Sequence, residues 1–295
     1  MTAGSESALR ADIVEVGRRM YARAYTASND GNISVRLGSD RLLMTPKSVC
    51  KGFMTPDMMV VTDLDGRKLQ GDRDPSSEML MHLEVYRQRP DVQAVVHAHP
   101  PIATGFAVAG IPLTRAVLAE VLTTLGSIPI AEYATPSTSE LPEAVRKYIK
   151  AHDGMLLANH GALTVGGDLM SAYYKMETIE HFAKISLVAR MLGRENLIAR
   201  EEVDRLQELR GTYGIKAPAP ICADPATLVG VGPGSVLDDA TCQIVEAPAG
   251  GGQRLVADLP GGPSRAADRR HEGDEIRLTY RELAALIEEA IRSVR

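Results

Sequence analysis

The chain has 295 residues, of which 44% are hydrophobic, and its formal net charge is −5 at a sequence pI near 5.9. This composition supports a large buried core, which excludes a disordered protein, and it gives no basic field for a nucleic acid. No apolar run reaches the roughly 20 residues that span a bilayer, and the first residues do not follow the pattern of a signal peptide, so we expect a cytoplasmic protein with no nucleic-acid or membrane partner.

The first elements form a helix, a loop and a strand. Apolar residues recur every three to four positions from Leu9 through Ile13 and Val16 to Met20, which predicts a helix packed on a core. The turn-forming residues 29–32 (Asn-Asp-Gly-Asn) follow, and residues 33–37 then alternate apolar and polar side chains as a half-buried strand does. The loop is therefore expected at the start of a strand.

The next two hundred residues mix hairpins with helices. Residues 58–69 predict a hairpin around an Asp-Gly turn, and the VVHAH segment predicts another strand. Helices are predicted at residues 142–150, 169–192 and 201–209. Strands that are joined both by hairpins and by helices indicate an α/β protein with a mixed or largely antiparallel sheet covered by helices.

The C-terminal part of the chain changes in composition. We expect a first domain at residues 1–215, a Pro/Gly-rich linker at 216–277 and an amphipathic helix at 278–295. The apolar stripe of that last helix runs through Leu283, Ile287 and Ile291. The helix could dock on its own domain or bind a partner, and the sequence leaves both open.

Two histidines share one face of a predicted strand. His97 and His99 are two residues apart, so their side chains project together, and a third histidine, His160, follows the apolar strand MLLAN in an Asn-His-Gly turn. Glu78 opens a predicted helix and offers a carboxylate as a fourth ligand, although a glutamate there also simply favours the helix dipole. These four residues predict a metal site.

The cysteines do not contribute to that site. They are odd in number, widely spaced and without a CxxC pair, which argues against a disulfide framework and a thiolate zinc site; they are Cys50, Cys222 and Cys242. Histidine and carboxylate ligands are therefore expected.

A second group of residues is suited to an anion. Residues 75–77 (Pro-Ser-Ser) precede the helix that Glu78 opens, and two hydroxyls beside free N–H groups at a helix start can bind a phosphate. The segments 30–32 and 45–48 add further donors, and each alone is more often a plain turn.

In chain order, these motifs resemble the class II aldolase and adducin N-terminal domain family, typified by L-fuculose-1-phosphate aldolase. The resemblance covers about residues 7–215, and its motifs are GNISVR, LLMTPKSV, PSSE, VVHAHP, NHGAL and TYGI. It implies a three-layer α/β/α sandwich with a mostly antiparallel central sheet, a zinc ion, and a fourfold homotetramer with active sites at the subunit interfaces. Mn²⁺ or Co²⁺ would be alternative metals.

The resemblance also implies roles for particular residues. The zinc ligands fall on His97, His99 and His160, with an acid/base glutamate at Glu78, and the late tyrosine that a neighbouring subunit contributes falls on Tyr213. The phosphate-binding positions fall on Gly31, Asn32, Lys47, Ser48, Ser76 and Ser77. Lys47 and Ser48 stand where the fuculose-type pattern has Thr and Gly, which adds a cation near the anion.

One departure concerns the reaction itself. The fuculose-type enzyme has a catalytic tyrosine between the HxH strand and the SIP strand, whereas this chain has none there. Glu120 is the ionisable substitute that we expect, with Arg115 next, and Glu120 could equally be a solvated helix residue.

The resulting prediction is a metal-dependent aldolase. It would cleave a small ketose 1-phosphate to dihydroxyacetone phosphate and a short aldehyde, with Glu78 as proton carrier and Glu120 or Tyr213 serving the C4 hydroxyl. Epimerase, dehydratase or decarboxylase chemistry at the same site is the alternative, and an adducin-like binding module without catalysis is a further one. The tail resembles peptides that recruit enzymes to bacterial microcompartments, which implies a shell protein as partner and a location inside the compartment.

Overall fold

The computed structural model describes residues 6–212 together with Ile215 and Ile221. Tyr213, the rest of the predicted linker and the predicted C-terminal helix of residues 278–295 lie outside the described residues. Apart from Ile221, the described residues belong to the predicted first domain.

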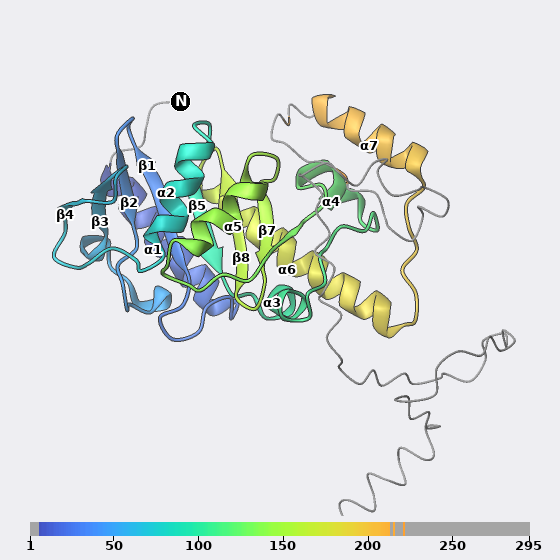
Figure 1. Cartoon of the computed structure of the whole chain (residues 1–295), viewed down its shortest axis with the longest axis horizontal. Helices are drawn as coiled ribbons and strands as arrows, with labels where there is room; N and C mark the ends of the chain where they lie inside the picture. Colours follow the sequence, from blue (N-terminus) through green and yellow to red (C-terminus); the bar gives the residue numbers. More distant parts are fainter. Residues whose placement is uncertain (1–5, 213–214, 216–220, 222–295) are drawn as a thin grey trace, which may run out of the picture. The chain divides into compact units, whose positions relative to one another are not determined.

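Within the described part of the chain, eight strands form one sheet in the order β4-β3-β2-β1-β5-β8-β7-β6 (Figure 1). The strands are β1 (Asn32–Leu37), β2 (Arg41–Met44), β3 (Val60–Asp63), β4 (Lys68–Gln70), β5 (Ala94–Ala98), β6 (Ile130–Ala131), β7 (Gly154–Leu157) and β8 (Gly161–Gly166). Neighbouring strands are antiparallel except for the pair β6 and β7. The predicted α/β class and mostly antiparallel sheet are confirmed.

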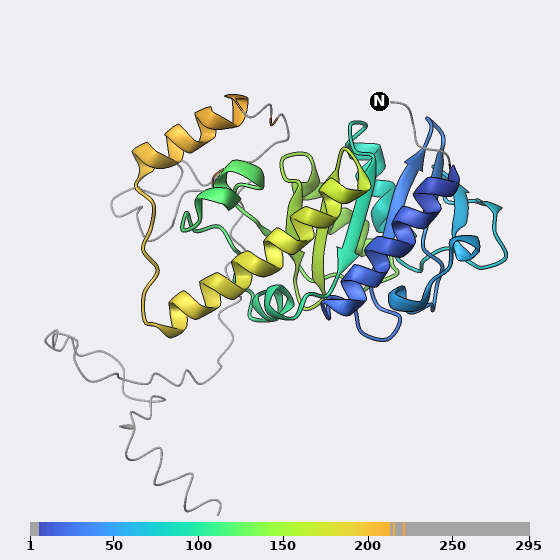
Figure 2. The ribbon, with the colours of Figure 1, turned by 180° about the vertical axis from the view of Figure 1, so that it is seen from behind.

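Helices cover both faces of the sheet. They are α1 (Glu6–Ala22), α2 (Met79–Gln88), α3 (Pro101–Val108), α4 (Ala119–Thr124), α5 (Glu140–Ile149), α6 (Leu169–Met191) and α7 (Arg200–Thr212), with 3-10 turns η1 (Lys51–Phe53) and η2 (Pro56–Met58). Figure 1 is viewed from the side of α2 and α5, and Figure 2 from the side of α1 and α6. The three-layer sandwich is therefore confirmed.

Each face of the sheet has its own apolar core. One core combines α1, α3, α4 and α6 with inward side chains such as Ile33 and Val96, whereas the other combines α2 and α5 with neighbours such as Val95 and Leu163. Val95 and Val96 are adjacent in β5 and belong to opposite cores, as the alternation of side chains along a strand requires. Burial on both sides fixes the register of the central strands.

The predicted helices begin and end close to the predicted residues. The helix predicted at 142–150 is α5 (Glu140–Ile149), the one predicted at 169–192 is α6, and the one predicted at 201–209 is α7. The residues 58–69 contain β3 and β4, which pair as a hairpin. None of the described helices is long and apolar enough to cross a membrane.

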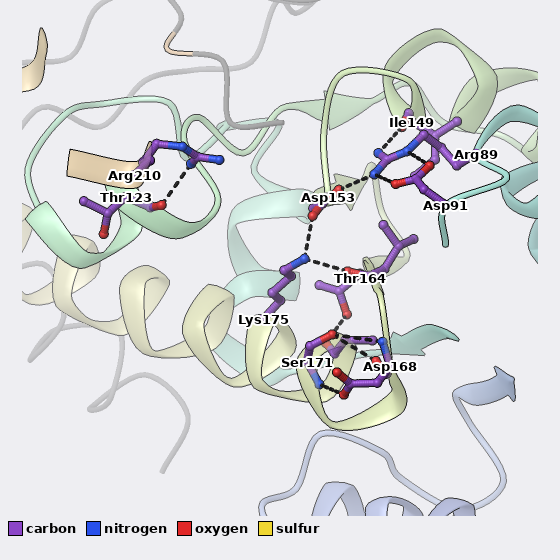
Figure 3. A network of polar contacts seen from close by, with 12 residues as sticks. Arg89, Asp91, Thr123, Ile149, Asp153, Thr164, Asp168, Ser171, Lys175 and Arg210 are labelled. Atoms are coloured by element: carbon purple, nitrogen blue, oxygen red, sulfur yellow. Dashed lines mark hydrogen bonds and ion pairs between the residues drawn. The ribbon is translucent and has the colours of Figure 1, made fainter. Parts of the chain in front are cut away.

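A buried ion network joins the two helical layers (Figure 3). Asp153, in the turn before β7, accepts a hydrogen bond of 3.0 Å from Arg89 at the end of α2 and another from Lys175 of α6. Arg89 also donates to the carbonyl of Ile149 and to Asp91. Only 2% of the Asp153 side chain is exposed, compared with 64% of Asp91. Asp153 thus holds the buried Arg89 and the half-buried Lys175 from opposite faces of the sheet.

We predict that Asp153→Asn lowers the free energy of unfolding by about 3 kcal/mol, because it leaves buried cations without their counter-charge. Asp91→Asn is the matched control, since Asp91 binds the same Arg89 from an exposed position, and it should cost less than about 1 kcal/mol. Urea unfolding measures both. Equal losses would contradict the role given to Asp153.

Candidate active site

Three imidazole rings converge at the end of the central strands. His97 lies in β5, where it pairs with Asn32 of β1 and Leu163 of β8; His99 follows β5 directly. The rings of His97, His99 and His160 have centroids 4.7 to 5.0 Å apart, and their ligand nitrogens lie within 4.8 Å of one another. The structure therefore brings together the three histidines that the sequence singled out.

His160 reaches the group from a tight turn. Residues 158–160 connect β7 to β8, and Asn159 adopts a left-handed conformation with φ of 55°. Asparagine tolerates this region better than most residues, because its short polar side chain can bond locally. The turn places His160 beside the end of β5, where His97 and His99 lie.

The donor set fits a divalent metal ion. The Nδ1–H group of His97 donates to the carbonyl of Ala162 at 2.9 Å, which leaves the lone pair of its Nε2 free for a ligand. Nε2 of His97 and Nε2 of His99 lie 3.1 Å apart. Nitrogens that share one tetrahedral zinc ion are about 3.4 Å apart, given Zn–N bonds of about 2.1 Å. Nδ1 of His99 faces a carboxylate oxygen of Asp30 at 3.5 Å, as ligand histidines commonly do.

The carboxylate of Glu78 faces the same group of rings. Its oxygens lie 3.3 Å from Nε2 of His97 and 3.0 Å from Nε2 of His160, and the side-chain amide of Asn32 donates to it at 2.7 Å. Burial alone would raise the pKa of Glu78, but the imidazoles of His97 and His160 hold it well below its ordinary value. Burial also lowers the pKa of His99 to about 3, with His97 and His160 adding to the effect. Glu78 is therefore the anion of the site.

A buried chain of hydrogen bonds extends from Glu78 under α2. Because Asn32 donates its amide to the carboxylate, its oxygen accepts from Nε2–H of His82, at 2.5 Å. Nδ1 of His82 then accepts from the hydroxyl of Ser34 at 2.6 Å, and Ser34 accepts from Tyr86 at 3.0 Å. Burial lowers the pKa of His82 to about 3, so this ring is neutral. The direction of every bond follows from the charge on Glu78.

A cavity of about 270 Å³ opens beside Glu78. All six positions predicted to bind phosphate line it, and so do Glu78, His99 and His160; the six are Gly31, Asn32, Lys47, Ser48, Ser76 and Ser77. Two of the segments are joined directly, because Pro46 and Pro75 form a β-bridge and the amide of Ser76 donates to the carbonyl of Thr45. Residues from three separate loops thus form one wall.

The wall of this cavity can bind an anion. Ser76 and Ser77 precede Glu78 at the start of α2, where the helix dipole favours negative charge and their two hydroxyls can donate to it. Lys47 and Ser48 are exposed at the rim. The side chain of Asn32 is already hydrogen-bonded to Glu78 and His82, so it is less available to bind an anion than the hydroxyls of the serines are.

Some residues that line the cavity were not predicted from the sequence, and some predicted residues do not line it. Lys51 and Ser137 line the cavity without having been predicted; the Ser/Thr-rich segment before α5 was the available signal for Ser137, and Lys51 had none. Glu120 lies exposed in the first turn of α4 and is not among the residues that line this cavity. Arg115 pairs with Glu195. The role of Glu120 stays a prediction, as does that of Tyr213.

Comparison with known proteins gives concordant matches. Residues 11–187 match the family model described as class II aldolase and adducin N-terminal domain. The 5-methylthioribulose-1-phosphate/5-deoxyribulose-1-phosphate aldolase of Rhodospirillum rubrum is 31% identical over 74% of this chain and 97% of its own length. The 3-oxo-tetronate 4-phosphate decarboxylase of Pectobacterium atrosepticum is 31% identical over 62% of this chain and 86% of its own. A solved L-fuculose 1-phosphate aldolase superposes with a TM-score of 0.65 at 31% identity and covers 70% of this chain and 98% of that chain.

We predict that Gly31→Ala weakens metal binding. Gly31 has a φ of 71°, and a Cβ there would lie 2.9 Å from the carbonyl of His97 and 2.7 Å from a methyl of Thr26. Gly38 is the matched control, because its φ is 70° but nothing lies within 4 Å of its Cβ position. Both alanines should cost about 1–2 kcal/mol of backbone strain, and Gly31→Ala about 1–3 kcal/mol more for overpacking.

Metal content by elemental analysis and urea unfolding measure the two effects. Gly38→Ala should retain the metal content of the wild type, and Gly31→Ala should lose part of it. Equal stability and equal metal content in the two variants would contradict this account of the loop.

Proposed function

The chain belongs to the class II aldolase and adducin N-terminal domain family, and on that premise we propose that it is a metal-dependent aldolase that cleaves a ketose 1-phosphate to dihydroxyacetone phosphate and a short aldehyde. One observation carries the proposal: His99, His160 and Glu78 line the same cavity as the residues of the phosphate-type wall, and His97 lies against them. A substrate bound in it by its phosphate would present its carbon chain to Glu78.

The metal would be held by His97, His99 and His160, with Glu78 as the carboxylate beside them. We propose zinc, with Mn²⁺ or Co²⁺ as alternatives, because the donors are imidazole nitrogens and a carboxylate. When bound, the ion supplies an electrophile that stabilises negative charge on the oxygens of the substrate. Buried walls around His97 and Glu78 keep water from competing for that charge.

The proposed reaction breaks the bond between C3 and C4. A base takes the proton of the C4 hydroxyl, the aldehyde leaves with the C4 carbonyl, and the electron pair stays on the three-carbon fragment. A proton then has to be delivered to C3, and Glu78 is the group that we assign to it: its carboxylate, ionised in the free site, would take up a proton from water in the cavity and pass it to C3. The chain through His82 fixes the orientation of Asn32 and hence of Glu78.

The group that serves the C4 hydroxyl is proposed to come from a neighbouring copy of the chain. Glu120 is exposed in α4, and α7, which directly precedes Tyr213, is tied to α4 by the bond from Gln207 to the carbonyl of Leu122. The exposed acid is available to another subunit in the homotetramer that the family resemblance implies, and Tyr213, which follows α7 in the chain, is the second candidate. Both assignments are part of the proposal.

Decarboxylation of a phosphorylated keto acid is the second candidate, and it is supported by the similarity to the decarboxylase of Pectobacterium atrosepticum. Loss of carbon dioxide leaves an electron pair on the carbon next to a carbonyl, which needs the same charge stabilisation and the same proton from Glu78. Epimerisation and dehydration would use the same groups. A binding module without catalysis has no need of three converging imidazoles around a buried carboxylate.

We predict that Glu78→Gln reduces release of dihydroxyacetone phosphate from its ketose 1-phosphate by about 10²–10⁴-fold, the usual contribution of a general acid or base. The amide is nearly isosteric but cannot carry the proton. A coupled dehydrogenase assay over a panel of ketose 1-phosphates, with metal-analysed protein, measures the rate. Glu143→Gln, which changes the same kind of group at an exposed position of α5, is the control and should keep the wild-type rate.

Release that persists in Glu78→Gln would remove this residue from the mechanism. Metal-loaded wild type that releases carbon dioxide from a phosphorylated 3-keto acid, and nothing from the ketoses, would favour the second candidate instead.

A further inference from the structure

Lys51 is a buried lysine in the wall of the active-site cavity. It is the first residue of η1, only 1% of it is exposed, and it lines the cavity together with Glu78 and His99. Lysine is almost never fully buried unless its charge is paired. Its position therefore requires an explanation that neither the fold nor the proposed reaction has supplied.

The backbone of Lys51 is held in place by close packing against α1. A Cβ on Gly17 would lie 2.7 Å from the carbonyl oxygen of Lys51 and would also collide with the side chain of Met54. The absence of a side chain at Gly17 thus lets the helix press directly on η1. The backbone of Lys51 is therefore fixed by this contact, and its side chain extends from there into the interior.

The ammonium group of Lys51 bridges two of the loops that line the cavity. Nζ donates to the carbonyl of Asn29 at 2.9 Å and to that of Val49 at 2.7 Å. Asn29 precedes the 30–32 loop, and Val49 follows the turn that contains Lys47 and Ser48. These are two of the segments predicted to bind phosphate. The charge lies between them.

No carboxylate of the described residues lies within the 4 Å of an ion pair with Nζ, and its hydrogen-bond partners there are the two carbonyls. An ammonium group has three N–H donors, so one remains for a ligand. Burial lowers the pKa of Lys51 to about 8; Cys50, Asp30 and Glu78 offset part of that effect, but none of them is a counter-charge in contact with Nζ. An anion in the cavity would supply that counter-charge.

We propose that Lys51 is a substrate-binding residue whose ammonium group pairs with the phosphate of the bound ligand, between the 30–32 loop and the Lys47–Ser48 turn. This inference rests on the proposed function only in naming a phosphate ester as the ligand. Lys47 lines the same cavity from an exposed position, whereas Lys51 is shielded from water by the protein itself. A charge that is removed from water makes the stronger hydrogen bond.

The test is calorimetric binding of inorganic phosphate to the metal-loaded, full-length protein. Lys51→Met removes the charge and both hydrogen bonds, whereas Lys51→Gln removes the charge and keeps an N–H donor. Both variants should bind phosphate roughly 10- to 100-fold more weakly, the range that a hydrogen bond to a charged group spans. Lys184→Met removes a charge from an exposed site on α6 and should bind as the wild type does.

Acetate and glycolate are the second arm, because a carboxylate could also neutralise Lys51. Weakened phosphate binding with unchanged metal content and unchanged glycolate binding supports the inference. Wild-type phosphate affinity in both variants overturns it. If Lys51→Gln alone binds phosphate with wild-type affinity, the effect comes from the hydrogen bonds to the loops and not from the charge, which overturns the inference. A loss of binding that affects glycolate and not phosphate would place Lys51 at the reacting end of the substrate, and that also overturns it.

The outcome is independent of catalysis. Phosphate binding that depends on Lys51, in a protein that releases no dihydroxyacetone phosphate from any ketose, would remove the proposed reaction and leave this inference standing. Release of dihydroxyacetone phosphate by a protein whose phosphate binding does not depend on Lys51 would support the proposed reaction and overturn this inference.

Discussion

The buried carboxylate of Glu78 is the group on which the rest of the site depends. An ionised carboxylate out of water is costly unless it is paired and hydrogen-bonded, and here it faces His97, His160 and the amide of Asn32. Its charge dictates which way Asn32 points, and through Asn32 it dictates the tautomer of His82. A single anion thus sets the hydrogen bonding of a chain that runs under α2.

The position of Glu78 also links the two ends of the cavity. It is the residue directly before α2, so the serines that precede it in the chain lie at the helix start while its own side chain reaches the histidines. The end of β5 and the turn after β7 supply the three imidazoles, and the loops supply the wall that we propose for the phosphate. A substrate held at the wall therefore has its carbon chain within reach of the proton carrier, which is the arrangement that aldol cleavage needs.

Much of this arrangement could be predicted from local sequence. The spacing of His97 and His99, the Pro-Ser-Ser-Glu run and the Asn-His-Gly turn are short-range patterns, and the structure brings their residues together at the cavity or, for His97, directly behind its histidines. Lys51 could not be predicted, because its burial depends on the contact of η1 with Gly17, which lies 34 positions earlier in the chain. The direction of the hydrogen bonds at His82 depends on the charge of Glu78, which reaches it through Asn32 of β1. Glu120 was predicted as a catalytic residue only because the expected tyrosine is missing, and the absence of a residue does not indicate where another side chain lies.

The most direct measurement is exchange of the C3 hydrogen of dihydroxyacetone phosphate with deuterated water, without aldehyde, followed by NMR. This half-reaction isolates the proton transfer assigned to Glu78 from the cleavage of the carbon bond and from the group at the C4 hydroxyl. If Glu78 carries this proton, exchange requires both the metal and Glu78. The metal-loaded wild type should then exchange the C3 hydrogen, and metal-loaded Glu78→Gln should not. Exchange at the wild-type rate in Glu78→Gln, or none in a wild type that binds both metal and ligand, would contradict this account.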